Sequence, residues 1–227
     1  MNLDMARRVV GLGAADDAVE AIPMGADLSA VPDRVTRTAG APLRLLFVGR
    51  LVEKKGLSHL IDAIAAIDHS GVSLRVVGDG PLAEDLRKRA VGLPIEFVGQ
   101  AGRAALFAEY ARADVVVFPS VTARSGDRDG LPVALLEAMG SGCAVIGSRI
   151  AGIDEAVVDG ESGVLVPSGD TAAIAAAIER LAGDDEEVDR LGAGALARSG
   201  DFSTEAIGQR YRGILTTILE EARARRP

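Results

Sequence analysis

The feature that most constrains the fold is an alternation, from about Leu43 onward, of short apolar runs with longer segments of helical period. The runs are rich in Val, Ile, Leu and Phe with little polar alternation, which is typical of strands covered on both faces. They read LRLLFVG, SLRVVGDG, IEFVGQ, DVVVFPS, CAVIGS and GVLVP. The order predicts right-handed βαβ units in an α/β fold, an open, doubly wound, Rossmann-like parallel sheet of about six strands.

Three parts of the chain differ in pattern. Residues 41–183 form the predicted Rossmann-like core, and residues 184–227 predict two further helices, the second beginning after an N-cap at Ser203. Residues 1–40 combine a weakly helical start, a short strand predicted at 18–25 and a loop. This first part cannot bury much surface by itself, so we expect it to be an edge piece or a linker.

Composition narrows the function. The net charge of -8 over 227 residues gives no broad basic surface, so nucleic acid is not expected as a partner. No apolar run approaches the ~18 residues of a membrane span and the single cysteine, Cys143, cannot form an internal disulfide, so we expect a cytoplasmic protein. Aromatic residues make up only 3%, so a bound sugar would be held by hydrogen bonds and not by stacking.

Unusual residues gather where the predicted strands end, which is where open parallel sheets bind ligands. Arg50 and Lys55 follow the first strand beside Gly49. Cations near a helix N-terminus oppose its dipole, so this pair favours a phosphate or diphosphate site. Glycine turns with Gly78 and Gly80 follow the second strand.

The stretch GDGPLA, from Gly78 to Ala83, also fits a dinucleotide fingerprint, with Glu96 as the candidate ribose acid. It follows the second strand instead of the first, and Pro81 removes an amide that could face a pyrophosphate. An NAD-dependent oxidoreductase is therefore the less favoured alternative.

The acidic pair in DRD, Asp127 and Asp129, has the spacing of some metal sites, but no third oxygen ligand is evident nearby, so no metal is predicted. His59 and His69 are predicted to lie at the surface, which gives no support to a histidine metal site or a catalytic triad.

The most specific stretch is DGLPVALLEAMGSG, which begins at Asp129 and continues into a helix that carries Glu137. A carboxylate between Leu136 and Ala138 is costly to bury alone, so Glu137 should meet hydroxyl donors or an opening. A vicinal ribose diol would supply such donors. The alternative is that Glu137 lies on a solvent-exposed face of the helix and binds no ligand.

With these residues assembled, the chain from about Ala21 to its end resembles the C-terminal, donor nucleotide-sugar-binding domain of GT-B glycosyltransferases, specifically glycosyltransferase family four (glycosyl transferases group 1). The motifs FVGRLVEKKG, VVGDGP, FVGQ, VFPS, DGLPVALLEAMGSG and DGESGVLVPSGD occur in the family's order. The family's N-terminal half is not represented, and residues 1–40 resemble its end, while the helix after Phe202 resembles the one that crosses back to it.

The resemblance implies a role for each matched residue. Arg50 and Lys55 would hold the donor diphosphate, Glu137 the ribose, and main-chain atoms around Val98 the base. Asp129 stands where the family has glutamate and would approach the sugar and phosphate, so Arg50, Lys55, Asp129 and Glu137 form the expected catalytic set. The other expected substrate-binding residues are Gly49, Gly78, Gly80, Ser120, Gly130, Leu131 and Pro132.

The expected activity is transfer of a hexose from a UDP-, GDP- or ADP-sugar to an acceptor by a retaining, metal-independent glycosyltransferase of glycan biosynthesis, without any cofactor. The acceptor is a glycan, a lipid-linked or a small molecule, and a full-length protein could lie at the inner membrane surface. The alternative from another class is a non-catalytic nucleotide-sugar-binding module. The isolated chain is expected to turn over poorly, because half a cleft cannot exclude water or place an acceptor.

Overall fold

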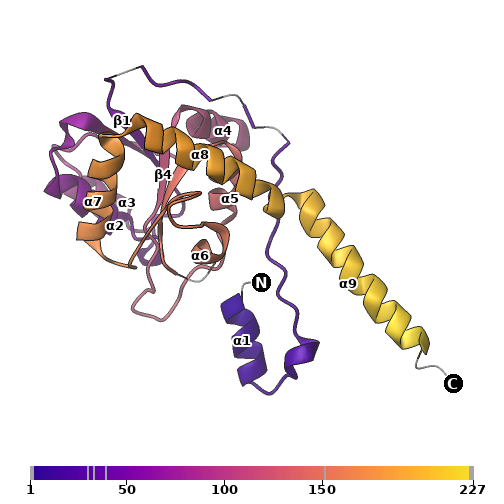
Figure 1. Cartoon of the computed structure of the whole chain (residues 1–227). Coiled ribbons are helices and arrows are strands. Elements are labelled where there is room, and N and C mark those ends of the chain that lie inside the picture. The colour runs from indigo at the N-terminus through magenta and orange to yellow at the C-terminus, as the bar shows by residue number, and fades with distance from the viewer. Residues whose placement is uncertain (1–2, 30, 33, 39, 151, 225–227) are drawn as a thin grey trace.

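The computed structural model describes residues 3–29, 31–32, 34–38, 40–150 and 152–224. It contains one sheet covered by helices on both faces, with a short helix from the beginning of the chain beneath it and a long helix projecting away at the end (Figure 1). Among the helices in these ranges, none is both long and apolar enough to cross a membrane.

The sheet has six strands, all parallel, in the order β3-β2-β1-β4-β5-β6. This confirms the predicted α/β class and the strand number. Apolar side chains point alternately to the two faces, so that Leu45 and Phe47 of β1 join one core cluster and Leu46 and Val48 join the other. The strands are β1 (Leu43–Val48), β2 (Val72–Val77), β3 (Ile95–Gly99), β4 (Val115–Phe118), β5 (Ala144–Ser148) and β6 (Val164–Val166).

Helices α2, α3 and α7 cover one face, where their buried side chains pack with the first cluster, and α4, α5 and α6 cover the other. Their bounds are α2 (Leu57–Ala66), α3 (Ala83–Arg89), α4 (Arg103–Arg112), α5 (Val133–Gly140), α6 (Ile153–Ala156) and α7 (Thr171–Ala182). Short 3-10 helices lie at Asp16–Ala18, Glu53–Lys55, His69–Gly71 and Gly200–Phe202.

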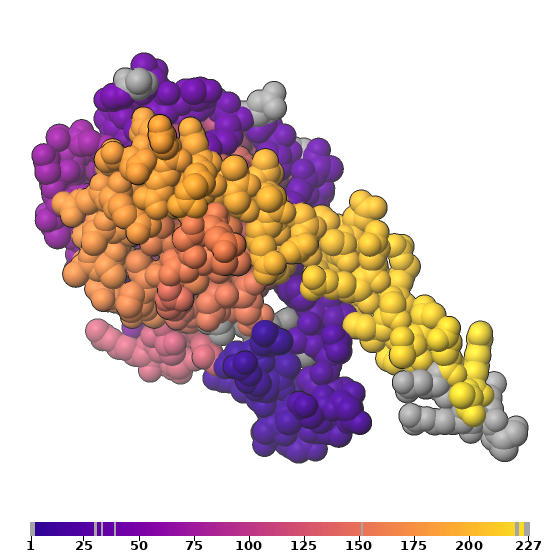
Figure 2. Space-filling view, viewed as in Figure 1, coloured from indigo at the N-terminus to yellow at the C-terminus, as the bar shows by residue number. Residues whose placement is uncertain are grey.

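The predicted terminal segment 184–227 divides into two different helices. Helix α8 (Asp185–Ser199) packs against α5 and β5 and buries Leu191 and Ala195, so it belongs to the core. Helix α9 (Thr204–Ala224) begins after the predicted cap, where Ser203 Oγ accepts a hydrogen bond of 3.1 Å from the amide of Ala206. Of these two helices, α9 projects away from the core, as Figure 2 shows.

The beginning of the chain is helical at α1 (Leu3–Gly11), as predicted. The strand predicted at 18–25 is wrong, because none of the strands that the structure describes lies alongside to pair with its backbone groups. The backbone instead makes a single bridge at Ala26, opposite Ser203.

A buried charge cluster closes the amino-terminal edge of the sheet. Asp114, only 3% exposed at its side chain, accepts hydrogen bonds from Arg44 N (2.9 Å) and Nε (3.0 Å). Arg37 Nε lies 3.3 Å and Arg34 Nη2 3.6 Å from the same carboxylate. The cluster fastens the segment before β1 to the core.

The single cysteine lies within this core. Cys143 is buried, its Sγ donates to the carbonyl oxygen of Tyr110 at 3.3 Å, and burial raises its thiol pKa to about 12.

Candidate donor-binding site

The candidate site lies at the carboxyl-terminal edge of the sheet, where the strand order reverses. Strands β1 and β4 are neighbours, yet β1 leads to α2 on one face and β4 to α5 on the other. Loops that leave adjacent parallel strands in opposite directions open a crevice between them, and open α/β sheets bind ligands at such points. The predicted residues around Arg50 and Asp129 follow these two strands.

Glycines allow the loops at this edge to touch through their backbones. A Cβ on Gly78 would lie 1.9 Å from the carbonyl oxygen of Gly49, and one on Gly56 would lie 1.8 Å from that of Pro119. Both glycines have positive φ, 140° and 67°. The loops after β1, β2 and β4 are therefore joined into one surface that no side chain at Gly56 or Gly78 could enter.

A hollow of about 590 Å³ opens beside these glycines. Arg50 lines it from an exposed position, and its guanidinium makes no ion pair or hydrogen bond within the ranges that the structure describes. The lining residues are Val48, Gly49, Arg50, Val77, Gly78, Asp79, Gly80, Gln100, Ala101 and Leu106. A guanidinium beside an open glycine surface offers donors to an anion.

Two lysines meet the predicted acidic residues in the loop after β4. Lys55 Nζ lies 2.7 Å from Asp129 Oδ2, and Lys54 Nζ lies 3.0 Å from Asp127 Oδ2 and 3.5 Å from Asp129 Oδ1. Hydrogen bonding to Asp127 raises the pKa of Lys54. Asp129 Oδ2 is buried and has no partner of good hydrogen-bond geometry, so its contact with Lys55 is ionic. Lys54 is a member of this group that the sequence analysis did not single out.

Glu137 lies half-buried on α5, near the helix that precedes β4. Its Oε2 atom accepts a hydrogen bond from the hydroxyl of Tyr110 at 3.3 Å. Burial raises the pKa of Glu137, while the Tyr110 hydrogen bond and the positive charge of Arg103 act in the opposite direction. Both partners come from α4 and neither was among the predicted residues. A hydroxyl on the buried face of a helix needs a partner, and that is the signal that could have pointed to Tyr110.

The other predicted residues take different positions at the same edge. Val98 lies half-buried near the end of β3, and Pro132 precedes the first residue of α5. Ser120 is buried, and its carbonyl oxygen accepts from Ser168 Oγ at 3.1 Å. The Gly130–Leu131 backbone lies against α6, since a Cβ on Gly152 would come within 2.5 Å of the Leu131 amide nitrogen.

Glu96, the acid of the alternative dinucleotide fingerprint, is engaged elsewhere. It lies near the start of β3, directly opposite Arg75 of β2, and forms an ion pair with that residue. Arg75 in turn holds Glu109 of α4, with Nε 2.6 Å from Oε2. The geometry thus gives Glu96 a salt-bridge role and no place beside Gly78.

No group of three metal-binding side chains occurs among the residues that the structure describes. His59 is half-buried in α2, where its Nδ1 lies 3.3 Å from Thr171 Oγ1. Asp127 lies exposed in the loop after β4, where Lys54 pairs with it.

The fold and this crevice together define the Rossmann-like half of a GT-B protein, and comparison with known proteins agrees. The family described as glycosyl transferases group 1 matches residues 42–184. The chain belongs to this family, and its fold is that of the C-terminal domain of a GT-B glycosyltransferase.

Individual relatives support the same placement. The amylovoran biosynthesis glycosyltransferase AmsK of Erwinia amylovora is 32% identical over 180 residues, 77% of this chain and 44% of that protein. Glycogen synthase of Mycobacterium tuberculosis (strain H37Rv) is 32% identical over 214 residues, 90% of this chain and 49% of that protein. The chain spans about half the length of the curated relatives it matches.

A solved structure has the same fold. HepE of Anabaena, crystallised in complex with UDP, superposes with a TM-score of 0.81 at 23% identity, over 93% of this chain and 61% of that one. At this identity the likeness concerns the fold.

Proposed function

We propose that this chain is the donor-binding domain of a retaining, metal-independent glycosyltransferase, which transfers a hexose from a nucleoside-diphosphate sugar to an acceptor. The observation that carries the proposal is the guanidinium of Arg50, which has no partner among the described residues and lies beside the glycine-lined hollow, with Lys55 on the same connection after β1. Family membership supports the reaction class. The UDP bound to HepE makes a nucleoside diphosphate the first ligand to test.

In the proposed reaction, the bond between the anomeric carbon and the diphosphate oxygen breaks, the acceptor hydroxyl oxygen attacks that carbon from the same face, and the leaving diphosphate takes the hydroxyl proton. Negative charge builds on the leaving diphosphate, and Arg50 and Lys55 stabilise it through charge-assisted hydrogen bonds. Lys55 is paired with Asp129 in the free chain, so a phosphate would share or replace that contact. No step in this scheme uses a metal ion or a cofactor.

The remaining groups would orient the donor. Glu137 would accept hydrogen bonds from the ribose hydroxyls, and Asp129 would approach the sugar. The backbones near Gly78, Gly80 and Gly130 would allow close contact with the ligand, and those around Val98 would contact the base.

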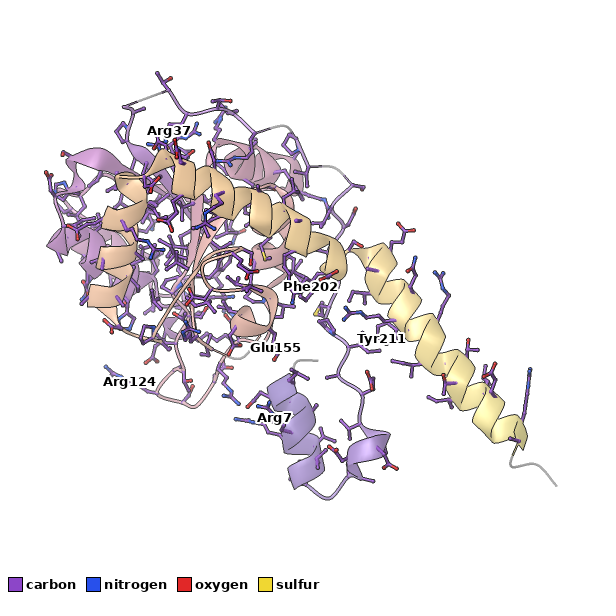
Figure 3. The ribbon with its side chains drawn as sticks, in the orientation of Figure 1. Arg7, Arg37, Arg124, Glu155, Phe202 and Tyr211 are labelled. Carbon is purple, nitrogen blue, oxygen red and sulfur yellow. The ribbon has the colours of Figure 1, made fainter. Side chains whose placement is uncertain are left out.

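Helix α9 supports the proposal that a further domain completes the cleft. Beyond Ile207, four large apolar side chains, from Tyr211 to Leu219, lie along it at three- and four-residue intervals and are 50–57% exposed. Figure 3 marks Tyr211 on α9, beyond the junction with the core at Phe202. Such a stripe suits burial against a second domain, which would bind the acceptor. The proposed location of the whole protein is the cytoplasmic side of the membrane.

The test is calorimetric titration of the chain with UDP, GDP, ADP and NAD, repeated with Lys55→Ala. We expect one nucleoside diphosphate to bind and the substitution to weaken it by about 10- to 100-fold, as for a charge-assisted contact. Arg124→Ala is the matched control, because the Arg124 side chain is 96% exposed and its Nε lies 3.6 Å from Glu53 Oε1. Binding of NAD alone, or of none of the diphosphates, would overturn the proposal.

A catalytically silent nucleotide-sugar-binding module would give the same titrations. The two are separated by assaying sugar release from the donor once the chain is joined to, or mixed with, an acceptor domain. Binding without any transfer in that assembly would favour the module.

A further inference from the structure

Tyr110 lies beneath the candidate ribose-binding carboxylate without reaching the surface. Its side chain is 0% exposed and belongs to α4, whereas Glu137 is carried by α5. We propose that Tyr110 is a positioning residue, whose hydroxyl fixes Oε2 of Glu137 so that Oε1 remains available to a ribose hydroxyl. The inference rests on the proposed donor-binding function.

The hydrogen bonds define the position. The Tyr110 hydroxyl lies 3.3 Å from Glu137 Oε2 and 3.2 Å from the carbonyl oxygen of Ala134, one turn earlier in α5. A phenol has a single proton, so these two acceptors share one donor. The hydroxyl therefore ties α4 both to the first turn of α5 and to the carboxylate.

The second oxygen of the Glu137 carboxylate differs from the first in its hydrogen bonding and its access to solvent. Glu137 Oε1 makes no hydrogen bond within the described part of the chain, and it is not among the buried side-chain atoms that lack a partner. It is therefore accessible to solvent. With Oε2 held by Tyr110, Oε1 keeps its acceptor capacity for a ribose hydroxyl.

The tyrosine itself is held firmly. Its ring meets that of Phe107 edge-on with centroids 5.8 Å apart, and its backbone carbonyl accepts from Cys143 Sγ. Burial, and then the charge of Glu137, raises the pKa of Tyr110, so the phenol stays protonated and remains a donor.

Arg103 is the other charged group that acts on this carboxylate. It also comes from α4, lies over the Phe107 ring at 5.1 Å, and its Nη2 donates to Asp27 Oδ2 at 3.0 Å. Because Asp27 already engages that guanidinium, Tyr110 is the group that contacts Glu137 directly.

The test compares Tyr110→Phe with the wild-type chain, using UDP and 2′,3′-dideoxyuridine diphosphate as probes. Loss of the hydroxyl should weaken UDP by about fivefold, as for one hydrogen bond, and leave the dideoxy compound nearly unchanged. The preference for the ribose hydroxyls would then shrink, which a purely structural defect would not produce, since it would weaken both ligands alike. Tyr211→Phe is the matched control on exposed α9 and should change neither affinity.

A second measurement does not depend on nucleotide. The Glu137 carboxyl carbon is titrated by NMR in the ligand-free chain, and Tyr110→Phe should raise its pKa because the ionised form loses a donor. An unshifted titration, or equal weakening of both diphosphates, would overturn the inference.

The two proposals fail differently. If wild-type chain binds no UDP, the proposed donor function falls for UDP and the carboxyl titration alone decides the contact between Tyr110 and Glu137. If UDP binds and the titration shifts but the ribose preference does not shrink, Tyr110 tunes Glu137 without positioning it, and the inference is wrong.

Discussion

Both edges of the sheet carry arginine and aspartate residues, but at one edge these residues bind each other, whereas at the other edge Arg50 and Asp129 do not. At the amino-terminal edge, Arg34, Arg37 and Arg44 surround Asp114, and each guanidinium also donates to a backbone carbonyl oxygen. At the carboxyl-terminal edge, Arg50 has no partner within the described ranges, and Asp129 Oδ2 is buried without a well-formed hydrogen bond. Arg37 and Arg124 mark these opposite ends in Figure 3. Satisfied cations hold the fold, whereas unsatisfied ones are available to a ligand.

Removing the buried acid should have the largest effect on stability. Asp114→Ala leaves three guanidinium groups facing one another, so we expect unfolding free energy to fall by about 3 to 5 kcal/mol in urea titration. Asp189→Ala is the control, because its side chain is 81% exposed and 3.9 Å from Arg34 Nη1, and should cost below about 0.5 kcal/mol. Similar losses of unfolding free energy in Asp114→Ala and Asp189→Ala would show that the buried charge cluster does not stabilise the amino-terminal edge as proposed.

A smaller loss is expected at the glycine-lined edge. Gly78→Ala would place a methyl group 1.9 Å from the Gly49 carbonyl oxygen, at a φ of 140°. Strain and displacement of the loop should lower the unfolding free energy by about 2 to 3 kcal/mol. Gly71→Ala has open space around it and should be nearly neutral in the same urea titration. A neutral Gly78→Ala would show that the loops are not locked together.

Arginine substitutions at the two edges should show opposite effects. Arg50→Ala should weaken nucleoside diphosphate binding about tenfold with little change in Tm, because the Arg50 side chain makes no hydrogen bond or ion pair among the residues that the structure describes. Arg44→Ala should lower stability by about 1 to 2 kcal/mol and leave affinity unchanged. Calorimetry and thermal unfolding of both variants check this, and a parallel loss of affinity and stability in either would contradict it.

The smallest effect concerns the pH dependence of stability at Glu137. Burial raises the pKa of Glu137 in the folded chain, so between the unfolded-state pKa and this raised value the folded state binds more protons than the unfolded state. The unfolding free energy therefore falls as the pH rises through that range. Glu137→Gln should therefore raise Tm by about 1 to 2 °C at pH 7, and the gain should vanish at pH values below about 4. Thermal scans from pH 3 to 8 would measure it, with exposed Glu161→Gln as a flat control.

Local pattern was sufficient for most of the fold and for the place of the site. The apolar runs predicted all six strands, and the residues after each run met at one edge because parallel strands end together. The strand predicted at 18–25 failed because its pattern carries no information about a neighbouring strand.

The partners of charged residues were not predictable in the same way. Arg44 and Asp114 are 70 positions apart, and Tyr110 and Glu137 are 27 apart. Neither pair has a spacing that a helix or strand repeat would reveal. Only the structure shows that the Arg44 side chain binds Asp114 whereas the Arg50 side chain has no partner among the described residues.

Because Cys143 is buried, the reactivity of its thiol can be used to measure how often the core of the chain opens. It is the one thiol in the sequence, and it is sealed in the interior with a pKa of about 12. An aromatic disulfide reagent should therefore leave the native protein unlabelled until the core opens, so the labelling rate reads out the opening equilibrium. Labelling of each variant with and without nucleotide would then rank stabilities through this one sulfur atom, without an engineered cysteine.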